Sequence, residues 1–470
     1  MTHNPKVITT SQIADVLSEH FSDRDQITCY LGSNAATPTA SIEALTRSIE
    51  ARSPKFPFIR MVHLLLQGPV PYLKAGLQDR IMAYSLFSTK EVREAANEGR
   101  AFYIPCTLAN IESIIRPGHD YTPDFVILKV SQNPLTGEYS LGLSAEALHA
   151  AINHARLVIA ELDPSMPFTQ GHSIVDASTI DYLITEGVKP VYELRAPDFD
   201  NLSAAERRIG EQIAQHFISD GATLQVGIGK IPDAVVAVIR DGNFHDLGVQ
   251  TELYGDGLMT LQKLDIITNR RKRNNIGYSA TSLIMGSREL YDFVHMRTGV
   301  QMRPCAYTNK ASVIQANAPF VAINTAMGAD LFGNIWADYV DARRYYSGVG
   351  GQPDFVRALQ DPACGTAIIA MKSITRDGSS KIVPAHPAGV SLTASSYDSV
   401  VLVTEFGIAD LRGLAAGEKA LAIASVCHPS YREEYLKSIA ENELFTKPRH
   451  FSLQSVPKGV TPYEGSIVLE

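Results

Sequence analysis

Short apolar runs rich in β-branched residues alternate along the chain with segments of helical periodicity. Runs of this length between polar segments are typical of buried strands. Five of them predict strands in the first half of the chain, at residues 27–31, 58–66, 125–130, 157–162 and 191–194. Strands that alternate with helices predict largely parallel sheets covered by helices on both faces.

Two of the intervening helices carry capping signals. One is predicted over residues 88–99, ending at Gly99, and the other from Ser203 to near Gly221. In each, a serine precedes a glutamate by three residues, which is the spacing of a capping box. The expected capping pairs are Ser88 with Glu91 and Ser203 with Glu206.

The clearest break in the pattern is the polar, proline-containing segment 195–201, after which a helix and then a new strand begin. A chain of 470 residues exceeds the size at which one hydrophobic core usually stops growing. We therefore predict an N-terminal α/β domain over residues 1–197 and a C-terminal α/β domain over residues 198–470. The tail at 453–470 matches no assignable pattern.

The net charge of −8 argues against nucleic acid or an anionic membrane as a main partner. The five cysteines are odd in number, widely spread and without metal-ligand spacing, so we expect reduced thiols and no metal site. The first 17 residues lack a signal-peptide core, and no stretch approaches a membrane span. We expect a cytoplasmic protein.

Glu252 is the candidate nucleophile. It follows the apolar stretch 247–249 and precedes Gly255, Asp256 and Gly257, which we expect to form a flexible turn before a helix at about 258–264. A carboxylate presented between a strand and such a turn can attack an acyl group. Alone the signal is weak, because most carboxylates are solvated surface charges.

Two glycine-rich runs strengthen the case. Residues 347–355 contain Gly348, Gly350 and Gly351, whose backbone N–H groups can turn toward a bound oxygen. Residues 224–234 combine an apolar strand, the turn Gly227-Ile228-Gly229 and a helix start. Taken singly, each glycine run is more often an ordinary tight turn.

In combination these runs resemble the class I coenzyme A transferases of the acetyl-CoA hydrolase/transferase group, which includes 4-hydroxybutyrate, butyrate and succinate CoA-transferases. The resemblance extends from about Gly32 to about Tyr435. Further family-like runs occur at residues 140–144, 285–293, 306–309, 322–326, 404–413 and 428–433. Each run is short, but their order and spacing together are specific.

The resemblance implies two related, open α/β domains with mostly parallel sheets flanked by helices and an active site in the cleft between them. It implies that Glu252 is the catalytic glutamate and that Asn309 is a side-chain donor near the anhydride, and the Gly351 backbone N–H is our candidate for a second oxyanion donor. For coenzyme A we expect contacts with Gly227, Ile228, Gly229, Gly348, Gly350 and Gly351. The bare glycine pattern is weak evidence, and Asn309 is otherwise a helix cap.

The expected activity is transfer of coenzyme A between an acyl-CoA and a short-chain carboxylate, through a glutamyl-CoA thioester and without a permanently bound cofactor. The carboxylate is acetate, butyrate, 4-hydroxybutyrate or a dicarboxylate such as succinate or itaconate; a dicarboxylate would need a second cationic contact that the sequence does not place. The rivals are an acyl-CoA hydrolase of the same fold and a non-catalytic CoA-binding protein. We expect a homo-oligomer, a dimer or tetramer.

Other conspicuous residues have more ordinary interpretations. Glu405 is a rival nucleophile but is better explained as a structural carboxylate at a strand end, and His428 as a turn or cap. Trp336 is expected in the core. The basic run 270–273 is expected to be a solvated face, with CoA contact as the alternative. Departures from the family pattern at residues 171–176 and at Ser396 bear on which acid binds.

Overall fold

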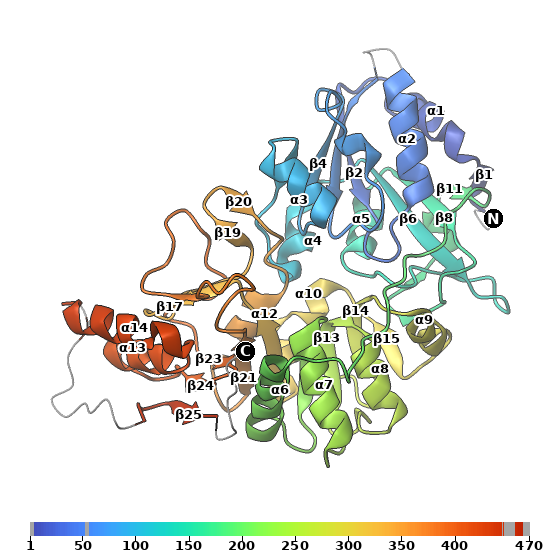
Figure 1. Cartoon of the computed structure of the whole chain (residues 1–470). Coiled ribbons are helices and arrows are strands. Elements are labelled where there is room, and N and C mark those ends of the chain that lie inside the picture. The colour runs from blue at the N-terminus through green and yellow to red at the C-terminus, as the bar shows by residue number, and fades with distance from the viewer. Residues whose placement is uncertain (1–3, 52–55, 444, 446–455, 464–470) are drawn as a thin grey trace.

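The computed structural model describes residues 4–51, 56–443, 445 and 456–463. Two ten-stranded sheets, both largely parallel, form its framework (Figure 1). The α/β class and the parallel sheets flanked by helices are as predicted.

The first sheet is built in the first 184 residues and has the strand order β1-β11-β8-β6-β2-β3-β4-β5, with β7 paired to β6 and β10 paired to β7. Its main strands pair in parallel, while β7 runs antiparallel to β6. The elements are β1 (Lys6–Ile8), α1 (Ile13–His20), β2 (Gln26–Leu31), α2 (Thr39–Ala51), β3 (Phe58–His63), β4 (Ile81–Ser85), α3 (Lys90–Asn97), β5 (Ala101–Tyr103), α4 (Ile111–Ile114), β6 (Phe125–Gln132), β7 (Tyr139–Ser140), α5 (Leu148–His154), β8 (Leu157–Leu162), β9 (Gln170–Gly171), β10 (Ile174–Val175) and β11 (Tyr182–Ile184).

The second sheet has the order β25-β24-β23-β21-β16-β12-β13-β14-β15-β9. It includes β9, which comes from the first half of the chain and pairs in parallel with β15. The elements up to the middle of this half are α6 (Ala204–Phe217), β12 (Thr223–Val226), α7 (Lys230–Asp241), β13 (Gly248–Tyr254), α8 (Asp256–Lys263), β14 (Ser279–Ile284), α9 (Arg288–Val294), β15 (Val300–Met302), α10 (Cys305–Thr308), α11 (Ala311–Ala316) and β16 (Phe320–Thr325).

The last part of the chain completes this sheet and adds two small ones. It comprises β17 (Gly328–Asp330), β18 (Ile335–Trp336), β19 (Tyr339–Asp341), β20 (Arg344–Tyr345), α12 (Gln352–Ala358), β21 (Gly365–Ala370), β22 (Ile382–Val383), β23 (Val400–Thr404), β24 (Gly407–Asp410), α13 (Ala416–Ser425), α14 (Pro429–Glu441) and β25 (Val460–Pro462). β25 pairs with β24 at the edge of the second sheet, so part of the unassigned tail is a strand.

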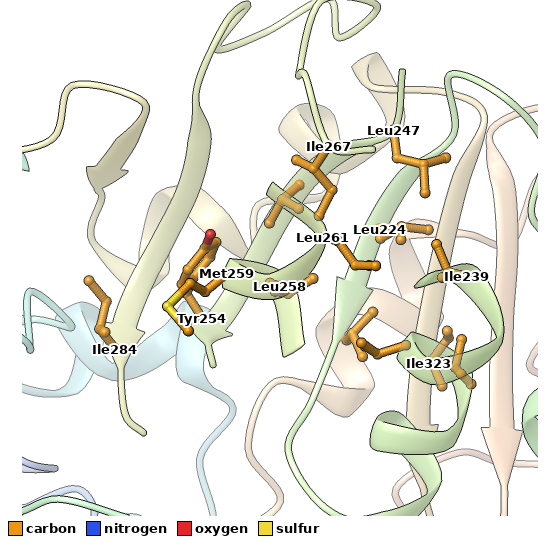
Figure 2. Close-up of a cluster of buried hydrophobic side chains, with 14 of the residues drawn as sticks. Leu224, Ile239, Leu247, Tyr254, Leu258, Met259, Leu261, Ile267, Ile284 and Ile323 are labelled. Carbon is orange, nitrogen blue, oxygen red and sulfur yellow. The ribbon is translucent and has the colours of Figure 1, made fainter. Parts of the chain in front are cut away.

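Buried aliphatic side chains hold the layers together. Figure 2 shows a part of this core, in which Leu224 and Tyr254 of the second sheet lie near Leu258 and Leu261 of α8. The same cluster also takes in buried residues from the first half, among them Leu143. Because the two halves share a core, their relative position is fixed by packing as well as by the chain connection.

Of the two predicted capping boxes, one forms and the other does not. The capping box at α6 is confirmed: the Glu206 backbone N–H donates to Ser203 Oγ at 3.3 Å, and the Ser203 N–H donates to Glu206 Oε2 at 2.9 Å. The box at Ser88 is wrong, because Thr89 is the N-cap of α3. The Ser88 hydroxyl instead bonds to Ser85 Oγ and Tyr345 Oη, a long-range contact that local spacing cannot reveal.

Some boundaries also differ from prediction. Residues 191–194 form no strand; instead the Tyr192 N–H donates to Ala35 O at 2.9 Å and the Leu194 N–H to Gly286 O at 2.8 Å. This segment therefore bonds to each half at single positions rather than joining a ladder. β3 ends at His63, and α6 ends at Phe217, four residues before Gly221.

Candidate active site

Glu252 lies near the carboxyl end of β13, in the middle of the second sheet. Leu224 of β12 pairs with Val249, so Glu252 is level with Gly227, directly after β12 ends. The prediction of a flexible turn after Glu252 is wrong: the strand continues to Tyr254, and Asp256 and Gly257 begin α8. Glu252 is therefore held by a sheet ladder, at the edge where open parallel sheets usually bind ligands.

Two predicted residues meet Glu252. Asn309 follows α10, is 2% exposed and donates from Nδ2 to Glu252 Oε2 at 3.1 Å. The Gly351 backbone N–H also hydrogen-bonds to the Glu252 carboxylate. Thr308 Oγ1 donates to Asn309 Oδ1 at 2.8 Å, which fixes the orientation of the Asn309 amide.

A second carboxylate, that of Asp354, accepts a hydrogen bond from the same Asn309 side-chain amide as Glu252. Asn309 Nδ2 donates to Asp354 Oδ2 at 3.1 Å, and the Ala109 backbone N–H donates to that oxygen at 3.0 Å. Asp354 belongs to the glycine-rich run 347–355 but is not among the predicted site residues. Its signal was its position three residues after Gly351, in the first turn of α12.

Burial and charge determine how the Glu252 carboxyl titrates. Burial, together with the nearby Asp354 charge, raises the pKa of Glu252 to about 7, against the lowering effect of the hydrogen bonds from Asn309 and Gly351. Burial also raises the pKa of Asp354. At neutral pH a large share of Glu252 is the carboxylate that nucleophilic attack requires.

Close approach explains why glycine occupies the turn before α12. A Cβ added to Gly351 would lie 1.8 Å from Glu252 Oε2 and 2.2 Å from Asn309 Nδ2. A Cβ added to Gly348 would lie 2.3 Å from the Leu86 carbonyl oxygen of the first half. A side chain at either position would displace the groups around Glu252 or separate the two halves.

These residues line a cavity of about 620 Å³ between the two halves of the chain. Its walls include Asn34, Leu64, Phe87 and Leu108 from the first half. From the second half come Glu252 and all of the turn residues 347–351. The cleft location is thus as predicted, and the volume is in the range of small-molecule sites.

The turn at residues 227–229 stands between two cavities. Gly227 and Ile228 line the large cleft, and they also line a second cavity of about 440 Å³ together with Gly229. Gly229 has a φ of 117° and is the N-cap of α7. The structure therefore brings Gly227 and Ile228 into the cleft with Glu252, whereas Gly229 faces the neighbouring space.

The alternative candidates take structural positions. Glu405 follows β23 and accepts from the Ser373 backbone N–H at 2.9 Å and from Ser373 Oγ at 2.7 Å. His428 is the N-cap of α14, and Trp336 is buried. These three interpretations are confirmed.

The basic run is only partly a solvated face. Its three arginines are exposed, but Lys272 is buried and donates from Nζ to Val249 O at 2.6 Å and to Tyr278 O at 2.9 Å. The expectation of solvation is wrong for Lys272, because two backbone carbonyls replace its water. Within the described part of the chain, no helix is both long and apolar enough to cross a membrane.

Comparison with known proteins identifies matching families and structures. Residues 3–193 match the model for the acetyl-CoA hydrolase/transferase N-terminal domain, and residues 286–439 match the model for its C-terminal domain. The chain is 36% identical to 4-hydroxybutyrate coenzyme A transferase of Clostridium kluyveri over 379 residues, covering 80% of this chain and 86% of that protein. It is 33% identical to the succinyl-CoA:acetate/propanoyl-CoA:succinate CoA transferase of Fasciola hepatica, covering 88% of this chain and 85% of that protein.

Two solved structures are similar over almost the whole chain. RipA from Yersinia pestis superposes with a TM-score of 0.80 at 27% identity, covering 93% of this chain and 97% of that one. The 4-hydroxybutyrate CoA-transferase from Porphyromonas gingivalis superposes with a TM-score of 0.75 at 27% identity and the same coverage of both chains.

Proposed function

The chain belongs to the acetyl-CoA hydrolase/transferase family and is a CoA-transferase family enzyme of short-chain acyl-CoA metabolism; from this premise we propose that it moves coenzyme A between an acyl-CoA and a short-chain carboxylate through a covalent intermediate on Glu252. The observation that carries the proposal is the placement of the Glu252 carboxylate in the cleft, with Asn309 and Gly351 donating to it.

The first half of the reaction consists of two displacements. The Glu252 carboxylate attacks the thioester carbonyl and expels CoA thiolate, which leaves a mixed anhydride. The thiolate then attacks the glutamyl carbonyl and expels the first acid as its carboxylate, which leaves a glutamyl-CoA thioester. The high-energy acyl bond is retained throughout, and no proton or electron is gained or lost.

The second half runs these steps in reverse with another acid. Its carboxylate attacks the glutamyl thioester, expels the thiolate and forms a new anhydride. The thiolate attacks the acyl carbonyl of that anhydride, releases the new acyl-CoA and regenerates the Glu252 carboxylate.

Each displacement passes through a tetrahedral oxyanion, and the donors around Glu252 are suited to stabilise it. Asn309 Nδ2 donates to Glu252 Oε2 and the Gly351 N–H to the same carboxylate, which supports assigning these two donors to the oxyanion formed during attack on the glutamyl carbonyl. Both are neutral, so they stabilise developing charge without forming a permanent ion pair that would hold back the nucleophile.

Binding of CoA is assigned to the glycine turns. Gly227 and Ile228 of the first turn line the cleft, as do Gly348, Gly350 and Gly351 of the second. The narrow arm of an acyl-CoA, lying between these two turns, would bring its thioester end to Glu252.

The test is a transfer assay in which all CoA species are followed by mass spectrometry. Acetyl-CoA or butyryl-CoA is mixed with a panel of mono- and dicarboxylates, with Glu252→Ala and Glu252→Gln as controls. New acyl-CoA species that vanish in both controls support the proposal. Release of free CoA alone would make the protein an acyl-CoA hydrolase, and CoA binding without turnover would make it a non-catalytic CoA-binding protein.

A further inference from the structure

The segment that leads to Gly351 lies against the other half of the chain. Residues 345–350 run from the end of β20 to Gly351 and belong to the second half, but Figure 1 shows β20 beside α3 of the first half. At the end of this segment the Leu108 backbone N–H donates to the Gly350 carbonyl at 3.3 Å. The residue immediately before the Gly351 donor is therefore bonded to the first half.

Asn97, the last residue of α3, holds the start of the 345–350 segment with both polar atoms of its amide. Its Nδ2 donates to the Tyr345 carbonyl at 2.9 Å, and the Tyr345 backbone N–H donates to its Oδ1 at 2.9 Å. The two bonds also establish which amide atom is nitrogen and which is oxygen. Because both bonds join one planar group to one residue, they restrain the orientation of the Tyr345 backbone as well as its position.

Further contacts with the first half support the same part of the segment. Tyr345 is 6% exposed, donates from Oη to Ser88 Oγ at 3.1 Å and stacks on Tyr103 of β5 with ring centroids 4.3 Å apart. Arg93 of α3 donates from Nη1 to the Tyr346 carbonyl at 3.0 Å. The first half thus binds this segment through backbone and side chains alike.

The segment has little room to absorb a shift between Tyr345 and Gly351. A Cβ added to Gly348 would lie 2.3 Å from the Leu86 carbonyl oxygen, so the backbone there lies directly against the first half. Close packing transmits displacements instead of absorbing them. A displacement of Tyr345 should therefore reach the Gly351 N–H.

The first half also holds the chain just after Gly351. Gly351 is the N-cap of α12, and Asp354 in the first turn of this helix accepts from the Ala109 backbone N–H at 3.0 Å. Gly351 is thus positioned between first-half contacts on both sides, with Asn97 forming two of the bonds on the side of β20.

We propose that Asn97 is a positioning residue for the transfer reaction, which fixes the 345–350 segment so that the Gly351 N–H stays aimed at Glu252. The inference rests on the proposed function, in which this N–H donates to the oxyanion formed on the Glu252 carboxyl. It gives α3 of the first half a part in the reaction through the geometry of Gly351.

The test is Asn97→Ala, which removes both bonds to Tyr345. We expect kcat for transfer to fall about 10-fold with less than about a twofold change in the KM for acyl-CoA, because a displaced donor costs rate rather than substrate binding. The Gly351 hydrogen bond lowers the pKa of Glu252, so weakening it should raise the midpoint of the pH profile of kcat/KM by about half a pH unit.

A second variant and a matched control accompany this test. Tyr345→Phe removes only the bond to Ser88 and keeps the stacked ring, so kcat should fall about threefold and the pH midpoint should move in the same direction. The control is Glu94→Ala, which changes an exposed side chain of α3 that pairs with Lys90 at 3.8 Å and should leave both readouts unchanged. Thermal unfolding checks each variant, and Tyr345→Phe carries the test if Asn97→Ala does not fold.

The outcomes separate this inference from the proposed function. A lower kcat in Asn97→Ala without a shifted pH midpoint would make Asn97 a structural residue and overturn the inference. An unchanged kcat, or a loss confined to the KM for acyl-CoA, would also overturn it. In each case transfer that Glu252→Ala abolishes leaves the proposed function standing, whereas a wild-type protein without transfer overturns both proposals.

Discussion

The two sheets each carry a glutamate near the carboxyl end of a strand, and the surroundings of these two glutamates differ. Glu161 of β8 in the first sheet is 0% exposed, accepts from the Ser41 backbone N–H at 2.7 Å and has Lys129 Nζ at 3.9 Å. Glu252 of β13 in the second sheet has neutral donors, the Asn309 amide and the Gly351 N–H, and a second carboxylate nearby.

This difference separates a structural carboxylate from a reactive one. Burial raises the pKa of Glu161 as well, but the Lys129 charge and the hydrogen bonds from Ser41 oppose that rise, and Lys129 Nζ forms an ion pair with the carboxylate at 3.9 Å. Burial raises the pKa of Glu252 to about 7, so its charge is only weakly stabilised. A carboxylate without a cation beside it keeps the electron density needed for attack, while an ion-paired one contributes to the fold.

The largest effect is expected from removing the unpaired carboxylate. Glu252→Gln and Glu252→Ala should lower kcat for transfer by about 10⁴-fold or more, because a covalent intermediate cannot form. The free energy of unfolding should change by only about 1 kcal/mol, since no ion pair is lost. Transfer assays and urea unfolding measure the two effects, and either variant retaining a tenth of wild-type activity would exclude Glu252 as the nucleophile.

The paired carboxylates of the first sheet should behave in the opposite way. Lys129→Met leaves Glu161 and Asp163 buried without their cation and should lower the free energy of unfolding by about 3–5 kcal/mol. The folded fraction should keep its kcat. The exposed Lys437, paired with Glu441 at 3.9 Å, is the control, because Lys437→Met should change stability by only about 0.5 kcal/mol. Equal losses in the two variants would contradict the structural role.

A smaller effect should follow from crowding the donors of Glu252. Gly351→Ala places a methyl group against Glu252 Oε2 and should lower kcat about 100-fold, with a smaller change in the KM for acyl-CoA. Gly76→Ala is the control for replacing a glycine without a clash, because a Cβ added to Gly76 meets no atom within 4 Å, whereas Gly351 has a φ of −93° and suffers only from the crowding. A loss confined to KM would remove Gly351 from the oxyanion contacts.

Local sequence signals anticipated the framework and the centre of the site. Apolar runs predicted β2, β6 and β8 to within two residues, and the capping pair at Ser203 predicted the start of α6. The family-like runs predicted that Glu252, Asn309 and Gly351 belong together, and the structure brings these three into contact.

Long-range contacts account for what the sequence could not predict. Ser88 looks like a cap but bonds to Tyr345, which is 257 residues away. Asp354 joins the site only once Asn309 is folded against it. Each depends on which strands become neighbours, and that is absent from local periodicity.

The smallest expected effect that compares the two kinds of carboxylate is the pH dependence of activity. Glu252 must be ionised to attack, so kcat/KM for acyl-CoA should rise about tenfold per pH unit below pH 7 and level off above it, since burial raises its pKa to about 7. Asn309→Ala removes a hydrogen bond that stabilises the ionised form and should move this midpoint upward by about half to one pH unit.

The same shift predicts a stability effect of opposite sign to that of an ion-paired acid. A carboxyl whose pKa is raised on folding favours the folded state when protonated, so its contribution is lost as pH rises from about 4.5 through about 7. Glu252→Gln should remove this slope from urea unfolding measured between pH 5 and 8. The contrary result would be a kinetic midpoint near pH 4.5 and an unchanged slope of unfolding free energy against pH in Glu252→Gln. The Glu252 carboxylate would then have to be stabilised by a cation, as Glu161 is, and the contrast between the two sheets would fail.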